Sequence, residues 1–149
     1  MEKYKQTEIP KVKTGIITNN RKSVAKYYTD NLQGKTVVND HLGINIKFTA
    51  LGKGELVYGR ALHLKKTAVL SALPTLLKVA KYNNFGIRKE KDPKDLLGYL
   101  NFKAFVFIND KKECVRISVR LLKTGDIYYN HEVNIIKNGQ KIRDCSRSQ

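Results

Sequence analysis

The first apolar pattern along the chain is helical. Val24, Tyr28 and Leu32 recur at i, i+4 and i+8, so their side chains would line one side of a helix. Asn20 is a residue type that caps helix beginnings, and Gly34 follows the end of the pattern. The spacing therefore predicts a short amphipathic helix in this part of the chain.

A longer helical stripe follows at residues 67–82. Its apolar members would share one side of a helix: Val69, Ala72, Leu73, Leu76, Leu77 and Ala80. Pro74 lies inside this stretch, and proline lacks the N–H that a helical turn needs. We predict the main core helix here, with a kink or break at Pro74, followed by a charged connection at residues 83–98.

Strict alternation of apolar and polar residues predicts the strands. Ile44, Ile46 and Phe48 alternate with polar residues, as in a strand with one buried side. Further strands are expected near Glu55 and at residues 101–108, 113–122 and 126–136.

Runs of helix followed by runs of antiparallel strands are typical of the α+β class. The expected architecture is an N-terminal helix and one long core helix packed on an antiparallel sheet of four to five strands. Residues 1–20 are predicted to be a flexible basic arm or linker. Residues 21–149 are predicted to be a single domain, which agrees with a chain of 149 residues.

The hairpin loops predict which residues face one another. With Gly125 as the third residue of its loop, a polar face forms on the last two strands. The expected pairs are Arg120–Tyr128, Ser118–Asn130 and Arg116–Glu132. The apolar residues between them would point to the core.

Other strands are expected to add residues to this polar face. A loop at residues 52–54 would contribute Lys47, Thr49, Glu55 and His63. A four-residue loop at Asn109–Lys112 would place Phe105 and Phe107 beside Arg116. His131 would point to the core in this register, unless a bulge turned it toward Ser118.

The charge balance indicates what such a face would bind. Lys and Arg total 29 against 13 Asp and Glu, which gives a net charge of +16. This excess is typical of proteins with polyanionic partners, so we expect a nucleic acid, above all RNA. A solubility role and an acidic protein partner are the alternatives. The acidic residues are scattered, so neither a metal nor another cofactor is expected.

The sequence also bears on location. No apolar run is long enough for a membrane span, and the first residues lack the apolar segment of a secretory signal. The two cysteines, Cys114 and Cys145, show no zinc spacing and are expected to be free thiols. We expect a cytoplasmic protein without membrane partners, or a domain delivered as part of a larger exported or injected protein.

The polar face carries the groups needed to cleave RNA without a metal. In this reaction a base removes the ribose 2′-OH proton, and the oxygen attacks the adjacent phosphorus. The unperturbed pKa of histidine lies near neutrality, so His63 is the best general base or acid, and arginine forks match phosphate oxygens. The expected catalytic residues are His63, Glu55, Tyr128 and His131. The expected nucleic-acid-binding residues are Lys47, Thr49, Lys65, Lys66, Arg116, Arg120 and Phe105.

Each of these residues also has a structural interpretation. The histidines can be packing residues of half-apolar strands, and the arginines a solvated face paired with Glu132. The structural alternatives for the others are a core position for Phe105 and Phe107, a hairpin role for Thr49 and Glu55, and an edge position for Tyr128.

Three segments carry a family resemblance: IKFTALGKGEL at 46–56, LHLKK at 62–66, and FKAFVFIND with VRISVRLLKTGDIYYNHEVN at 102–134. They resemble the small basic nuclease-like domains of phage and mobile-element polyvalent proteins and contact-dependent toxins, the barnase, EndoU, colicin and RelE-like group. The resemblance implies metal-independent cleavage of RNA, often tRNA, and a toxin role with a matching immunity protein. It would assign active residues at His63, Lys65, Thr49, Glu55, Arg116, Tyr128 and His131.

We therefore expect a metal-independent endoribonuclease, a toxin or mobile-element effector that acts on tRNA or other RNA. An acidic immunity or inhibitor protein would be its second partner. The alternative is a non-catalytic RNA- or DNA-binding accessory domain of a phage or plasmid protein. A protein-interaction or structural role is the third hypothesis.

Overall fold

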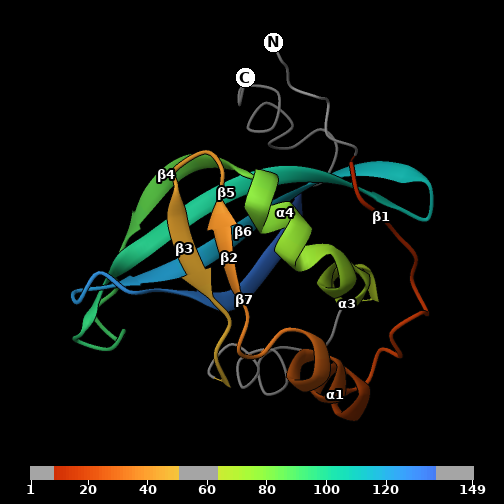
Figure 1. Cartoon of the computed structure of the whole chain (residues 1–149), viewed down its shortest axis with the longest axis horizontal. Helices are drawn as coiled ribbons and strands as arrows, with labels where there is room; N and C mark the ends of the chain where they lie inside the picture. The colour runs from red at the N-terminus through yellow and green to blue at the C-terminus, as the bar shows by residue number, and fades with distance from the viewer. Residues whose placement is uncertain (1–8, 51–63, 137–149) are drawn as a thin grey trace.

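The computed structural model describes residues 9–50 and 64–136, and Figure 1 shows their arrangement. The described helices are α1 (Arg21–Asn31), α3 (Leu64–Val69) and α4 (Leu73–Val79), with the 3-10 turn η1 (Leu70–Ala72) between the last two. The described strands are β1 (Lys11–Val12), β2 (Thr36–Asn39), β3 (Ile44–Lys47), β4 (Lys81–Ile87), β5 (Leu96–Ile108), β6 (Lys111–Leu122) and β7 (Ile127–Ile136).

These strands form one mixed, seven-stranded sheet. Strands β1 and β4 share the outer edge of β5, and β6, β7, β3 and β2 follow in that order. The pairs β1–β5 and β3–β7 are parallel, whereas the other neighbours are antiparallel. In Figure 1, α3 and α4 lie against one side of the long strands β5, β6 and β7.

The prediction of one long helix on an antiparallel sheet of four to five strands is wrong. The sheet is larger and mixed because β1 and β3 find parallel partners far along the chain. Strand β4 also occupies residues that were expected to end the helix and to form the charged connection. Its sequence, KYNNFGI, does not alternate, because an edge strand tolerates polar residues on both sides.

The apolar stripe at 67–82 forms short helices instead of one long helix. Helix α3 ends at Val69, η1 follows, and α4 begins at Leu73. Pro74 therefore lies in the first turn of α4, where its missing N–H removes no helical hydrogen bond. The predicted break near Pro74 is confirmed, and Ala80, with an extended ψ of 147°, ends α4.

The predicted N-terminal helix is confirmed as α1. The side chain of Asn20 caps it by accepting a hydrogen bond from the Ser23 N–H at 2.8 Å. Its apolar side buries Val24 and Tyr28 completely. Gly34, just past the helix, has a φ of +91°, a conformation that glycine adopts without strain.

An aromatic cluster joins α1 to the sheet. The ring of Phe48 lies 5.1 Å from that of Tyr129 and 6.3 Å from that of Tyr28, measured between centroids. The Tyr28 hydroxyl donates a hydrogen bond of 2.6 Å to the Thr49 carbonyl oxygen. Burial raises the pKa of Tyr28, so the phenol stays neutral in the folded protein.

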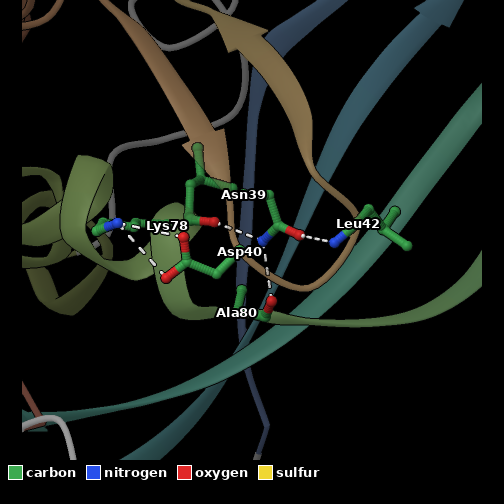
Figure 2. Close-up of polar contacts among 6 residues, drawn as sticks. Asn39, Asp40, Leu42, Lys78 and Ala80 are labelled. Atoms are coloured by element: carbon green, nitrogen blue, oxygen red, sulfur yellow. Dashed lines mark hydrogen bonds and ion pairs between the residues drawn. The ribbon is translucent and has the colours of Figure 1, made fainter.

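Asn39 connects strand β2 to the end of α4, as Figure 2 shows. Its buried amide donates to the carbonyl oxygens of Leu77 at 2.7 Å and Ala80 at 2.9 Å, and its own oxygen accepts from the Leu42 N–H at 2.8 Å. The last carbonyls of a helix have no partner within the helix. Asn39 supplies that partner, so one side chain satisfies the end of α4 and shapes the β2–β3 turn.

The next residue strengthens the same junction. The backbone N–H of Asp40 donates to the Lys78 carbonyl at 2.8 Å, and the Lys78 ammonium lies 3.2 Å from the Asp40 carboxylate. Both side chains are more than half exposed, so their ion pair adds little to stability. We call Asn39, Asp40, Leu77, Lys78 and Ala80 the α4 clamp.

Tight turns fix the register of the long hairpin β5–β6. Asn109 and Asp110 both have positive φ, at 51° and 68°, and Ile108 pairs with Lys111. This is a two-residue hairpin turn of the type that matches strand twist. The predicted four-residue loop at Asn109–Lys112 is wrong, and Phe105 consequently pairs with Cys114 instead of Arg116.

Strand β7 contains a bulge. Tyr129 pairs with Val119, but the next paired residue on β7 is Glu132, opposite Ser118. Asn130 and His131 are therefore extra residues on this strand. The predicted pair Arg120–Tyr128 is confirmed, whereas Ser118 pairs with Glu132 instead of Asn130, and Arg116 pairs with Asn134 instead of Glu132.

Candidate nucleic-acid interface

The long strands have two chemically different faces. On β5, Leu100, Phe102 and Val106 are buried on the side covered by α3 and α4. Tyr99, Asn101 and the other alternating residues point the opposite way. We call this second side, away from the helices, the open face.

One ladder row crosses the open face from β4 to β2. Its members occupy neighbouring paired positions on successive strands: Gly86, Tyr99, Arg120, Tyr128, Lys47 and Thr36. Adjacent strands are about 4.8 Å apart, so the row spans about 24 Å. We call it the transverse row, and it brings two tyrosines and two cations into one line.

A second row carries a higher density of positive charge. Lys81, Lys103 and Arg116 occupy neighbouring positions on β4, β5 and β6, and Asn134 continues the row on β7. Like charges directly opposite one another in a sheet are destabilising. We call this the cationic row.

Amides and a hydroxyl fill the space between the two rows. The Ser118 hydroxyl donates to the side-chain oxygen Oδ1 of Asn101 at 2.5 Å, and the Asn101 side-chain amide donates to the side-chain oxygen of Asn84 at 3.1 Å. These bonds connect three strands across the open face. They fix the orientation of neutral polar groups beside the cations.

The loop after β4 folds toward one end of the transverse row. Asp92 accepts a hydrogen bond of 2.7 Å from the Lys89 N–H and another from the Tyr99 side chain. The backbone bond from Lys89 lowers the pKa of Asp92 most, and the charges of Arg120 and Lys89 add to it. The ionised carboxylate therefore orients Tyr99 within the row.

Cations of the open face also contact other groups. The Lys112 ammonium lies 4.6 Å from the centre of the Phe105 ring, a cation–π contact. The Lys47 ammonium lies 3.5 Å from the Asp126 carboxylate, and both side chains are nearly half exposed. Such an ion pair is weak and screened by salt, so Lys47 can exchange its partner for a phosphate.

Several predicted binding residues and one predicted catalytic residue, Tyr128, lie on the open face. Arg120, Tyr128 and Lys47 are members of the transverse row, and Arg116 belongs to the cationic row. Phe105 shares this face and is 37% exposed, so it is not a core residue. Residues from β3, β5, β6 and β7 are thus brought together.

The remaining predicted binding residues lie elsewhere. Lys65 and Lys66 are on α3, where Lys65 forms an ion pair of 3.0 Å with Glu113 and Lys66 donates to the Asn134 side chain at 3.2 Å. Thr49 follows β3, and its hydroxyl is buried with no hydrogen-bond partner among the described residues. These three side chains do not form one phosphate clamp.

Three predicted catalytic residues cannot be placed. His63 and Glu55 lie outside the described residues. His131 lies in the bulge of β7, but its side chain is outside the described part. Tyr128 is the catalytic candidate whose side chain is described, and it is half-buried on the open face.

Sequence reasoning missed several residues of this face. Tyr99, Asn101 and Lys103 alternate with the buried Gly98, Leu100 and Phe102, so the signal was present in the sequence. Tyr99 was overlooked because the strand was expected to begin at residue 101, whereas it begins at Leu96. Lys81 gave no such signal, because β4 lies where a helix end was expected.

The cysteine prediction is wrong in one respect. Cys114, 8% exposed and on the open face, is disulfide-bonded instead of free. The other cysteine of the sequence, Cys145, lies outside the described residues. Spacing along the chain does not reveal which cysteines meet in space.

Within residues 9–50 and 64–136, no group of three or more His, Cys, Asp or Glu side chains is arranged to hold a metal ion. No helix in the same ranges has the length and apolar character needed to cross a bilayer.

Comparison with protein families identifies a relationship. A family model described as large polyvalent protein-associated domain 3 matches residues 16–129. This confirms the polyvalent-protein part of the expected resemblance, and the nuclease part stays a prediction. Neither the curated proteins nor the solved structures contain a match to this chain.

Proposed function

The chain belongs to the large polyvalent protein-associated domain 3 family, and we propose that it is a nucleic-acid-binding accessory domain that holds its ligand on the open face. One observation carries the proposal. Arg116, Arg120 and the exposed Lys81 lie on the face away from the helices, in a chain with a net charge of +16. Clustered cations on one face are the electrostatic footprint of a nucleic-acid interface.

Arg116 is the most informative residue of this face. It is half-buried, pairs across the ladder with Lys103, and takes part in no ion pair within the described part of the chain. A guanidinium in this position has its donors available for a phosphate. Binding a phosphate would also relieve the repulsion between neighbouring cations.

The test is the salt dependence of RNA binding. Fluorescence anisotropy of a labelled 20-nucleotide RNA should give a Kd of about 1–100 µM near physiological salt, rising steeply as salt increases. Arg116→Gln should weaken binding and reduce the slope of log K against log salt by about 0.7–0.9, because one phosphate contact is lost.

Arg21→Gln is the matched control. Arg21 is an exposed residue at the start of α1, on the helix side of the sheet. The same change of charge there should leave the slope as it is. Binding that ignores salt, or equal effects of both substitutions, would contradict the proposal and favour an acidic protein as the partner.

Metal-independent RNA cleavage is a second candidate, favoured by the bulge in β7. Bulges often occur beside active sites, and this one places Asn130 and His131 two and three residues beyond Tyr128. Incubation of RNA with the protein and EDTA would then produce 2′,3′-cyclic phosphate ends. His131→Ala and His63→Ala should abolish them in folded protein, and intact RNA in these incubations would rule this candidate out.

A further inference from the structure

The transverse row points to a particular class of ligand. Building on the proposed function, we propose that this row binds single-stranded nucleic acid, with bases stacked on Tyr99 and Tyr128 and a phosphate held by Arg120. The three residues lie at neighbouring positions on β5, β6 and β7. The two ring-bearing positions are therefore about 9.6 Å apart, with a guanidinium between them.

The aromatic side chains favour single strands over duplexes. Both tyrosines are half-buried, so part of each ring is accessible on a face without helices among the described residues. Base faces are available for stacking in single strands but are covered by neighbouring pairs in a duplex. An aromatic ring on this face can therefore stack on the bases of a single strand but not on those of a duplex.

The position of the helices leads to the same conclusion. Reading a duplex from its major groove requires a helix or a two-stranded ribbon that projects into the groove. The described helices pack on the opposite side of the sheet, as Figure 1 shows for α3 and α4. A flexible single strand can instead lie across the strands and follow the row.

Cations lie where the phosphates of such a strand would pass. Arg120 separates the tyrosines, and Lys47 extends the row beyond Tyr128. Arg116 of the cationic row lies four residues along β6 from Arg120, about 13 Å away. The backbone of a bound strand would therefore meet positive charge beside and beyond the stacked bases.

Asp92 would set the direction of the bound strand, because it lies near Tyr99, at the opposite end of the transverse row from Lys47. Its carboxylate accepts the Tyr99 side-chain hydrogen bond and stands close enough to Arg120 to feel its charge. It holds the ring in one orientation and repels phosphates from that end. The ligand backbone is therefore directed toward Lys47 and the cationic row.

The experiment compares ligands of equal length on the full chain. Fluorescence anisotropy would use labelled 12-nucleotide oligo(U) and oligo(dT), with 12-base-pair RNA and DNA duplexes as competitors. Both single strands should bind at least tenfold more tightly than the duplexes. Either sugar supports the proposal, since stacking needs only the base.

Substitutions locate the interaction. Tyr128→Ala and Tyr99→Ala should each weaken single-strand binding by about five- to hundredfold, while duplex binding stays as it is. Tyr128→Phe should retain most of the affinity because it keeps the ring. Tyr27→Ala, which removes a half-buried ring from α1, is the matched control and should leave the affinity unchanged.

A measurement on the unmodified protein covers the case in which an alanine variant does not fold. An oligonucleotide with 5-iodouracil should crosslink on irradiation to Tyr128 or Tyr99, identified by mass spectrometry. Crosslinks confined to other residues would overturn the proposal.

The outcomes distinguish the single-strand proposal from the proposed function. Equal affinity for single strands and duplexes, with a steep salt dependence, would overturn the single-strand proposal and leave the proposed function standing. Absence of binding to all four oligonucleotides at low salt would overturn the proposed function itself.

Discussion

The two faces of the sheet carry opposite chemistry on the same strands. On β5, Phe102 is fully buried under the helices, whereas Phe105, three residues later, is 37% exposed on the open face. On β6, Ile117 is fully buried, while Arg116 beside it is half-buried in a row of cations. One face is almost entirely apolar, whereas the other mixes charged, polar and aromatic side chains.

This difference separates what holds the fold together from what the fold offers to a partner. Apolar burial is the main source of stability, and the covered face contains it. The open face instead places Lys103 opposite Arg116, an arrangement that costs stability. Substitutions on the two faces should therefore affect different measurements.

The largest effect is expected for the two phenylalanines of β5. Phe102→Ala should lower the free energy of unfolding by about 3–5 kcal/mol, because it leaves a cavity in the core. Phe105→Ala should lower it by no more than about 1 kcal/mol, since it removes an exposed ring and a cation–π contact. Urea denaturation measures both, and equal losses would remove the distinction between the faces.

The α4 clamp is expected to rank second. Asn39→Ala should lower the free energy of unfolding by about 2–4 kcal/mol, because two buried carbonyls lose their donor. Denaturation would again measure the loss.

Asn39→Asp sharpens this test. An ionised carboxylate cannot donate to the carbonyls of Leu77 and Ala80, whereas a protonated one can. Burial beside these carbonyls should raise the pKa of the introduced acid. The loss in free energy of unfolding relative to wild type should therefore be smaller at pH 4 than at pH 7. A deficit that is the same at both values would show that hydrogen bonding at this position is unimportant.

Tyr28→Phe should have a smaller effect, about 1 kcal/mol, because the Thr49 carbonyl loses a hydrogen bond of 2.6 Å. Tyr27→Phe is its neighbour on the same helix and should be neutral. Thermal or urea denaturation of the pair distinguishes loss of this bond from a general effect of removing a hydroxyl from α1.

The same variant has a pH signature. Burial raises the pKa of Tyr28 above the value near 10 of an unfolded tyrosine. Its contribution to stability is thus complete below pH 10 and is lost as the pH rises beyond that value. Between pH 9 and 11, Tyr28→Phe should lose less stability than wild type, and parallel losses would contradict this.

The smallest effect is expected on the open face, and it has the opposite sign. Arg116→Gln should raise the free energy of unfolding by a few tenths of a kcal/mol at low salt, because it relieves repulsion from Lys103. Added salt should diminish the gain. A clear loss of stability would mean that Arg116 contributes to folding after all.

The sequence predicted which face of the sheet a residue lies on better than it predicted which residue lies opposite it on the next strand. Two registers were wrong: Phe105 was expected opposite Arg116 and lies opposite Cys114, and Arg116 was expected opposite Glu132 and lies opposite Asn134. Each error amounts to two residues. Because side chains alternate with a period of two, an even error leaves every residue on its predicted face.

Other features depend on contacts that local patterns do not encode. The parallel pairs β1–β5 and β3–β7 join segments separated by most of the chain, so alternation within one strand could not reveal them. Strand β4 was missed because its edge position imposes no period. The transverse row depends on the pairing of β3 with β7 and of β4 with β5. Only the Arg120–Tyr128 pair of this row could therefore be predicted from the sequence.

The pairing of β3 with β7 also has a consequence for synthesis of the chain. Lys47 emerges from the ribosome long before its partner Tyr128, and at typical elongation rates the interval is about 4 to 16 s. Until then the edge of β3 has no β7 to join. The sheet can therefore be completed only after the C-terminal third has been synthesised. Until then, the nascent N-terminal part must avoid aggregation.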